Sequence, residues 1–349
     1  MKIAMLLSGG VDSSVALAEL KRQGHRDIHA YYLKIWLEDD LQYLGQCPWE
    51  EDLAYARGVC EKLDVPLDII SLQTAYWDRV VAHTVAELKQ GRTPSPDILC
   101  NQHVKFGAFC DLIDSSYSHI ATGHYAQTLP GPAGTRLLKG VDPIKDQTYF
   151  LSRMSREQIA KALFPIGHIP KSEVRSLAKA YDLPTQDRPD SQGICFLGKL
   201  KFNDFVKAHL GERPGAIVEL ESGRVLGEHK GFWFHTVGQR KGLGLSGGPW
   251  FVVGKDPAKD IVFVSSEAAR MERPQTSFEI LEMHWLETPP SEGLSVKIRH
   301  GVRTTPCRLE ELDAGRYLVQ LEKADGGVAP GQYAVVYQGD ICLGAGVIA

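Results

Sequence analysis

The amino-acid sequence predicts an α/β protein, with an N-terminal doubly wound parallel sheet, a small, mostly β central domain and a C-terminal β-barrel. Two observations predict this fold class. Strand-like and helix-like segments alternate over about the first 200 residues, which is typical of a parallel sheet. The later segments are short, alternating and glycine-rich, which is typical of strands joined by turns. We therefore expect domains at residues 1–205, 206–272 and 273–349.

Each element follows from its own apolar pattern. In the first domain we expect strands at residues 2–7, 28–35, 67–72 and 119–122. Helices are expected after the first strand, where Val15, Ala16, Leu17 and Leu20 form an apolar stripe, and at residues 50–63 and 77–89. Short alternating segments follow at residues 216–226, 250–253, 261–264, 295–299, 305–309, 317–321, 334–337 and 341–345.

Length and composition exclude several classes of protein. With 349 residues, 43% of them hydrophobic, the chain can build two or three packed domains. No apolar run reaches the roughly 18 residues of a membrane helix, and a strand from Lys2 leaves no room for a signal peptide. Seven cysteines without a C-x-x-C pair fit neither a disulfide framework nor a short-spaced zinc site, so we expect the cytoplasm and no metal site. A net charge of -4 confines RNA contacts to a local patch.

The strongest motif lies between the first strand and the first helix. It consists of Leu7, Ser8, Gly9, Gly10, Val11, Asp12, Ser13 and Ser14. Glycines let the backbone approach phosphate oxygens, amides at a helix N-terminus bind anions, and the serines add hydroxyl donors. The lysine of a Walker A loop is missing, which disfavours γ-phosphoryl transfer. The alternative is an ordinary glycine turn in which Asp12 or Ser13 caps the helix. The motif resembles the loop of the PP-loop ATP pyrophosphatases, which split ATP between the α and β phosphates and adenylate a substrate oxygen.

Two cysteines stand in special contexts. Cys100 follows two prolines and precedes a helical pattern, so we expect it near a helix N-terminus, where the thiolate is favoured. Cys195 lies in an Asp190-to-Phe196 block after charged and polar residues, and a buried core cysteine beside Phe196 is the alternative. The remaining cysteines are interpreted as structural: Cys47, Cys60, Cys110, Cys307 and Cys342.

Six blocks in this order carry a closer resemblance. They are SGGVDSS, GRTPSPDILCN (91–101), ATGHYA (121–126), KDQTYFL (145–151), DSQGICF (190–196) and TVGQRKGLGL (236–245). Together they look like the bacterial tRNA 2-thiouridylases of the MnmA/TrmU family, and the likeness runs from Lys2 to Gly346. The resemblance implies a PP-loop, adenine nucleotide alpha hydrolase-like catalytic domain. It also implies that the two smaller domains bind tRNA.

The resemblance implies a reaction as well. The enzyme would adenylate the C2 oxygen of a wobble uridine (U34) with Mg²⁺-bound ATP, because that oxygen is a poor leaving group and AMP is a good one. Cys195 would receive persulfide sulphur from a carrier protein or a cysteine desulfurase relay. Cys100 would attack this persulfide as nucleophile, leaving a disulfide and delivering sulphide to C2. Asp97 would act as acid or base.

Binding residues are carried over in the same way. Adenosine would contact Leu33, where the family usually has methionine, and Gly123. The tRNA contacts implied are Ser95, Pro96, Asp97, His124, Lys145, Asp146, Gln147, Arg240, Lys241, Arg299, His300 and Gln332. The family more often has tyrosine at His300, and the 41–49 stretch departs from many relatives. An iron–sulphur cluster on the cysteines is neither required nor excluded by their spacing.

Three other functions stay open at this point. Another PP-loop enzyme, such as a tRNA lysidine synthetase or an amidotransferase-type synthetase, would adenylate without needing Cys100 or Cys195. A non-catalytic tRNA- or nucleotide-binding module would keep the fold and lack turnover. A structural zinc site on the two cysteines would bind metal stoichiometrically and unfold with a chelator. The sulphur donor, the tRNA species and the oligomeric state are not encoded in any motif.

Overall fold

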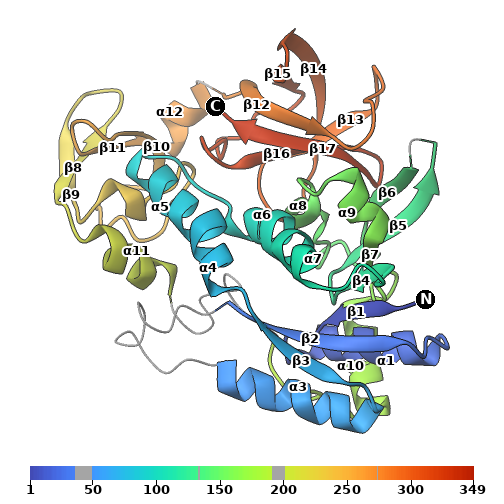
Figure 1. The fold of residues 1–349 in the computed structure, drawn as a ribbon. Helices are drawn as coiled ribbons and strands as arrows, with labels where there is room; N and C mark the ends of the chain where they lie inside the picture. The colour runs from blue at the N-terminus through green and yellow to red at the C-terminus, as the bar shows by residue number, and fades with distance from the viewer. Residues whose placement is uncertain (36–48, 133, 191–200, 273) are drawn as a thin grey trace.

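The computed structural model describes residues 1–35, 49–132, 134–190, 201–272 and 274–349, and it contains three sheets (Figure 1). The N-terminal sheet has the strand order β3-β2-β1-β4-β7, and every pairing is parallel. Its strands are β1 (Ile3–Leu6), β2 (Ile28–Lys34), β3 (Leu67–Ser71), β4 (His119–Ala121) and β7 (Ala162–Leu163). The predicted fold class is confirmed, and the first four strands lie within two residues of their predicted bounds.

Helices cover both faces of this sheet. The side chains of β1 point alternately to the two faces, and each face must be covered by its own hydrophobic cluster. Ile3 and Met5 join the cluster formed with α1 (Val11–Arg22), α3 (Trp49–Leu63) and α10 (Lys171–Ala180). Ala4 and Leu6 join the cluster on the other face. The carboxyl ends of β1, β2 and β4 meet at one edge of the sheet, which is where ligands bind in open α/β folds.

Two interrupted helices lie on the second face, between this sheet and the other domains (Figure 1). The first runs through α4 (Gln73–Tyr76), the π-helical turn η2 (Trp77–Val81) and α5 (Ala82–Lys89). It thus begins four residues before the predicted start. The second runs through α6 (Pro96–Leu99), the π-helical stretch η3 (Cys100–Ala108) and α7 (Phe109–Leu112). Cys100 therefore lies one turn inside its helix, not at the first turn.

The central domain is built on the four-stranded sheet β10-β11-β8-β9. Its strands are β8 (Gly215–Glu219), β9 (Val225–His229), β10 (Trp250–Asp256) and β11 (Ile261–Ser266), with α11 (Phe202–Leu210) and α12 (Glu267–Glu272) beside them. The segment predicted at residues 216–226 is a hairpin of two strands. Gly223, with φ +72, supplies the turn that the alternating pattern concealed.

The C-terminal domain is a closed barrel. The ring runs β12-β15-β14-β13-β16-β17 and is closed by the pairing of β12 with β17. Its strands are β12 (Ser277–Trp285), β13 (Leu294–Lys297), β14 (Thr305–Asp313), β15 (Arg316–Leu321), β16 (Tyr333–Gln338) and β17 (Ile341–Ile348). The predicted barrel is confirmed.

One hairpin joins the N-terminal domain to the barrel and was not predicted. β5 (Ala126–Gly131) pairs with β6 (Gly134–Lys139), and β6 pairs in turn with β17 (Figure 1). The following short helices, α8 (Thr148–Leu151) and α9 (Arg156–Lys161), also lie near the barrel. No helix in the described ranges is long and apolar enough to cross a membrane.

Candidate active site

The 7–14 loop connects β1 to α1 and is shaped by its own hydroxyl groups. The Ser13 Oγ lies 3.2 Å from the Ser8 amide nitrogen and 3.1 Å from the Ser8 Oγ. The hydroxyl of Ser14 donates to the Gly10 carbonyl oxygen at 2.8 Å. Gly10 precedes the helix with extended backbone and no side-chain cap. The loop thus has the backbone of an anion site at a helix N-terminus.

Close packing around the 7–14 loop explains why glycine stands at positions 9 and 123. Gly9 has φ +73, and a Cβ on it would lie 2.1 Å from the Asp52 carbonyl oxygen of α3. A Cβ on Gly123, which follows β4, would lie 2.7 Å from the Ser13 amide nitrogen. Leu33 is half-buried near the end of β2, the neighbour of β1. The structure therefore brings both predicted adenosine contacts to the sheet edge that holds the loop.

A charged network fixes Asp12 of this loop. The Lys171 Nζ lies 2.6 Å from the Asp12 Oδ1 and 2.9 Å from the Asp190 Oδ1. The Tyr125 hydroxyl donates to the same Asp12 oxygen at 2.7 Å. Burial and the nearby charge of Asp12 raise the pKa of Tyr125, so this hydroxyl keeps its proton.

Asp190 is the second carboxylate of the network. Lys145 contacts it at 2.7 Å, and Arg175 also pairs with it. Burial acts to raise the pKa of Asp190, but the hydrogen bonds from Lys145, Lys171 and Arg175 outweigh it and hold this pKa well below 3.8. The network thus ties the first residue of the DSQGICF block to the phosphate loop.

Arg188 makes a second connection between the same segment and the loop. Its Nη1 donates to the Gly9 carbonyl oxygen at 2.6 Å, and its Nη2 donates to the Asp52 Oδ1 at 2.7 Å. The guanidinium also lies 4.3 Å from the ring centroid of Tyr55. Cys195 itself lies outside the described residues.

The 91–101 segment carries the other cysteine. Cys100 is 1% exposed, and Ser95 and Pro96 are also buried. Asp97 is half-buried, and its negative charge acts on His300 of the barrel. Partial burial of the His300 ring, which stacks on Phe150, lowers its pKa, and the charge of Asp97 acts to raise it. Asp97 of the first domain and His300 of the barrel are thus near enough for the charge of one to affect the other.

The predicted tRNA residues fall into two groups. The exposed residues are Arg240, Lys241, Arg299 and His300. Of these, Arg299 pairs with Asp325 at 2.9 Å. His124 is half-buried, and its Nδ1 shares a hydrogen bond with the Thr122 hydroxyl at 2.8 Å. Burial lowers the pKa of His124 well below its usual value, so this ring is neutral at pH 7.

The second group faces the protein rather than solvent. The Asp146 carboxylate is 2% exposed and pairs at 2.7 Å with Lys297 of β13, which is equally buried. The Gln147 Oε1 accepts from the Tyr125 amide at 3.0 Å. The Gln332 Nε2 donates to the Thr93 and Pro94 carbonyl oxygens of the 91–101 segment. The family pattern grouped these residues with the exposed ones, but Asp146 and Gln332 connect domains and Gln147 holds the backbone of its own domain.

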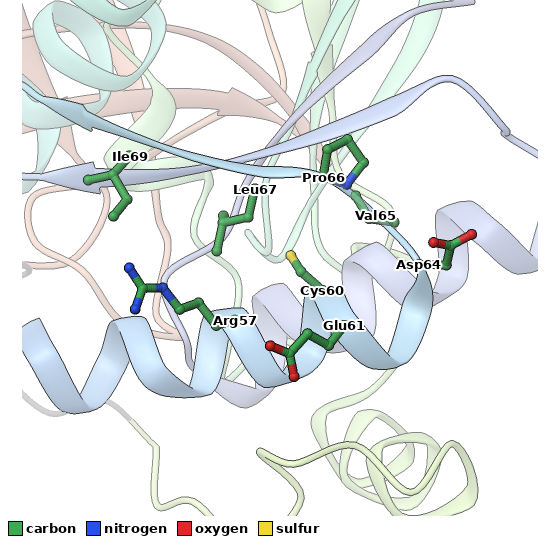
Figure 2. Close-up of a pocket in the computed structure, with 8 residues that line it drawn as sticks. All are labelled: Arg57, Cys60, Glu61, Asp64, Val65, Pro66, Leu67 and Ile69. Carbon is green, nitrogen blue, oxygen red and sulfur yellow. The ribbon is translucent and has the colours of Figure 1, made fainter.

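A cavity of about 490 Å³ lies between α3 and β3, away from these residues (Figure 2). It is lined by residues such as Arg57, Cys60 and Ile69, from the end of α3 onward, whereas the phosphate loop follows β1. Burial raises the pKa of Cys60 to about 11, which leaves this thiol protonated and unreactive at pH 7. The cavity is thus lined by a cysteine other than the two that the sequence singles out, Cys100 and Cys195.

Four residues of the site were missed from the sequence: Tyr125, Lys171, Arg175 and Arg188. Tyr125 lies inside the ATGHYA block and could have been singled out. Lys171, Arg175 and Arg188 stand in no recognised block, and only the fold brings them to the loop. Among the described side chains, no three of His, Cys, Asp and Glu lie close enough together to hold a metal ion.

Comparison with known proteins identifies the family. Three family models match in succession: the tRNA methyl transferase HUP domain over residues 1–199, the tRNA methyl transferase PRC-barrel domain over residues 203–266, and the aminomethyltransferase beta-barrel domain over residues 275–348. The tRNA-specific 2-thiouridylase MnmA of Parabacteroides distasonis is 46% identical over 356 residues, covering 100% of this chain and 99% of its own. The protein of the same name from Porphyromonas gingivalis is 43% identical over 364 residues, with the same coverage. The resemblance in the motifs is thereby confirmed, and the chain belongs to the MnmA family of tRNA-specific 2-thiouridylases.

Proposed function

We propose that this protein replaces the C2 oxygen of the wobble uridine of tRNA with sulphur, through an adenylated intermediate and a cysteine persulfide. Relatives named tRNA-specific 2-thiouridylase that match the whole chain support the overall reaction. The proposed domains at residues 1–205, 206–272 and 273–349 then have different roles in this reaction. The first activates the base and transfers sulphur, and the other two hold the tRNA.

The phosphate loop supports adenylation. Its amides and its Ser8 and Ser13 hydroxyls can bind the polyphosphate of ATP, and no Walker lysine is present to favour transfer of the γ-phosphoryl group. The Asp12 carboxylate and these hydroxyls are oxygen ligands of the kind that fits Mg²⁺ accompanying the nucleotide. The bound ion would neutralise phosphate charge. Lys171 and Arg188 keep the loop in place while pyrophosphate leaves.

The attachment of Asp190 to the loop is the observation that carries the sulphur-transfer proposal. Lys171 bridges Asp190 to Asp12 through contacts of 2.9 and 2.6 Å. Cys195 follows Asp190 by five residues, and five residues span at most about 18 Å. A persulfide on Cys195 would thus be at most this far from Asp190, which is attached to the loop that binds the activating nucleotide.

The uridine C2 oxygen attacks the α phosphorus of ATP, and pyrophosphate leaves. The Cys100 thiolate attacks the Cys195 sulphur of the persulfide, forming a disulfide and releasing sulphide. Sulphide attacks C2, AMP leaves, and an external thiol supplies two electrons to reduce the disulfide. Asp97, half-buried and three residues before Cys100, transfers protons during these steps.

Exposed cations support tRNA binding despite the net charge of -4. Arg240 and Lys241 lie on a glycine-rich loop of the central domain, and Arg299 lies after β13 of the barrel. Such residues would hold the phosphates of the anticodon stem-loop, while the wobble base is turned out into the site. The partners are therefore a tRNA with a wobble uridine and a persulfide-carrying protein.

The decisive experiment is nucleoside mass analysis of unmodified wobble-uridine tRNA after incubation with the protein, Mg²⁺-ATP and a persulfide donor. We expect 2-thiouridine in wild type and none with Cys100→Ala or Cys195→Ala. Pyrophosphate release without 2-thiouridine would instead support an adenylating enzyme without sulphur transfer. Unchanged thiolation in both variants would overturn the roles of the cysteines.

A further inference from the structure

Arg299 of the barrel lies against a turn, residues 325–327, in the connection between β15 and β16. Its Nη2 donates to both carboxylate oxygens of Asp325, at 3.1 and 2.9 Å. The Asp325 side chain is only 11% exposed, whereas that of Arg299 is 50% exposed. A guanidinium carries five N–H donors in a fixed fork, so a pair through Nη2 leaves Nη1 and Nε able to bind a phosphate.

The turn that holds Arg299 is itself fixed. The Gly327 amide donates to the Asp325 Oδ1 at 2.9 Å, which closes the turn through the side chain of its first residue. The Asp325 amide donates to the carbonyl oxygen of Gln275 at 3.1 Å, in the connection from the central domain to β12. The Asp325 carboxylate is therefore held in one orientation before it meets the arginine.

Gly327 provides the space in which the guanidinium lies. A Cβ on Gly327 would lie 1.9 Å from the Arg299 Nη1 and 3.0 Å from its Cζ. The φ of Gly327 is outside the left-handed region, so the backbone there accepts an L-residue. Glycine is thus needed at this position for space, and an alanine would displace the arginine rather than strain the backbone.

The other side of the same turn contacts the basic loop of the central domain, residues 236–245. Gly238, two residues before Arg240, has φ +89, and a Cβ on it would lie 3.0 Å from the Gly327 Cα and 3.4 Å from the Gly326 carbonyl oxygen. A cavity of about 690 Å³, lined in part by Val237 and Gly326, lies beside this contact. Because side chains do not fill that space, the close approach of the two backbones determines how the loop sits against the barrel.

We infer that Asp325 and Gly327 are positioning residues for tRNA binding, which hold the Arg299 guanidinium on the turn that also seats the basic 236–245 loop. The cations of the central domain and of the barrel then lie at a fixed spacing and can contact the phosphates of one RNA. Holding Arg299 before RNA arrives also lowers the entropy cost of ordering its long side chain. This inference rests on the proposed function, which makes Arg299 a tRNA contact.

The test uses two variants that keep the net charge and displace Arg299. Gly327→Ala puts a methyl group where the Nη1 lies, and Asp325→Glu moves the carboxylate by one methylene. Asp313→Glu is the matched control, because Asp313 is an exposed residue of the same barrel that pairs with Arg316 at 2.9 Å. Each change is also made together with Arg299→Met. The dissociation constant of an unmodified wobble-uridine tRNA is measured by filter binding at several salt concentrations, and thermal unfolding is followed in parallel.

We expect Gly327→Ala and Asp325→Glu each to weaken tRNA binding about 5- to 10-fold at low salt. The slope of log affinity against log salt should fall by about 1, because one phosphate contact is lost. The thermal midpoint of Gly327→Ala should stay within about 2 °C of wild type, since the displaced atom ends a flexible side chain. Neither change should weaken binding further once Arg299 is methionine, and Asp313→Glu should bind as wild type does.

Two results would overturn the inference while the proposed function stands. One is wild-type affinity in both Gly327→Ala and Asp325→Glu, and the other is an equal loss of affinity with and without Arg299. Arg299→Met with unchanged affinity and salt slope would overturn it as well, because the position of Arg299 would then not matter. If wild type does not bind this tRNA, the proposed function fails and the inference fails with it.

Discussion

The phosphate loop and the 91–101 segment are both loops that open into helices, but they are held by different means. The loop is fixed inside its own domain, by its serines and by contacts from Asp52, Lys171 and Arg188. The 91–101 segment is fixed across domains, through Pro257 and Gln332. Nucleotide binding should thus depend on one domain, and sulphur transfer on the relative position of three.

Removal of the Cys100 thiol should have the largest effect, because it should stop sulphur transfer and leave nucleotide binding intact. We expect Cys100→Ala to lower 2-thiouridine formation at least about a thousandfold, because no other group can take its place as nucleophile. The phosphate loop is held by contacts from Asp52, Lys171 and Arg188, so stabilisation by ATP in thermal unfolding should persist. Cys110→Ala is the matched control, since Cys110 is half-buried on α7 and its thiol donates to the Phe106 carbonyl oxygen of the same helix at 3.1 Å. Normal 2-thiouridine formation by Cys100→Ala would show that sulphur transfer does not depend on the 91–101 segment through this thiol.

The buried pair between Lys297 and Asp146 tests how firmly the barrel is held. Both side chains are 2% exposed, so Lys297→Met leaves a buried carboxylate without its cation. We expect a loss of about 3–5 kcal/mol in the free energy of unfolding, measured by urea denaturation. Adding Asp146→Asn should recover part of this loss, because no uncompensated charge remains. Equal stability of the single and double variants would show that the pair does not hold the barrel.

Gly9→Ala should damage the phosphate loop alone. A Cβ at this position meets the Asp52 carbonyl oxygen at 2.1 Å, so the backbone must move. We expect ATP to bind about 100-fold more weakly, or about 3 kcal/mol, by isothermal titration calorimetry. Gly24→Ala is the control, because Gly24 has a similar φ of +88 and a Cβ on it would have no neighbour within 4 Å among the described residues. It should cost about 1 kcal/mol of stability and leave ATP binding unchanged. Reactivity of Cys100 should stay normal in both variants.

The smallest effect concerns Asp190 and pH. Its pKa in the folded protein is held below the ordinary 3.8, so the unfolded state binds more protons as the solution is acidified. This carboxylate therefore contributes stability at pH 7 that is lost as the pH falls below about 4. Asp190→Asn should lower stability at pH 7 by on the order of 1 kcal/mol, after screening by solvent, and the difference should shrink toward pH 3. A difference that grows on acidification would contradict the assignment.

The sequence predicted much of the fold and supplied candidates for the site because these features are local. Gly9, Gly10 and the serines of the loop follow a strand and open a helix, and that order identifies a phosphate site. The alternation of strands and helices gave the parallel sheet, and the later short strands gave the barrel. Asp97 and Cys100 were singled out as candidates because their block is distinctive.

Only the tertiary structure decided how the regions meet. The hairpin of β5 and β6 reaches the barrel through β17, about 200 residues later, and no periodicity within a short window encodes such a pairing. Asp146 and Gln332 appear in the sequence as polar residues of surface blocks, yet they bond Lys297 and the 91–101 segment. Their burial depends on which distant backbone comes to lie beside them. Local sequence thus determined the chemical groups that this protein carries, and long-range packing determined the positions in which they work.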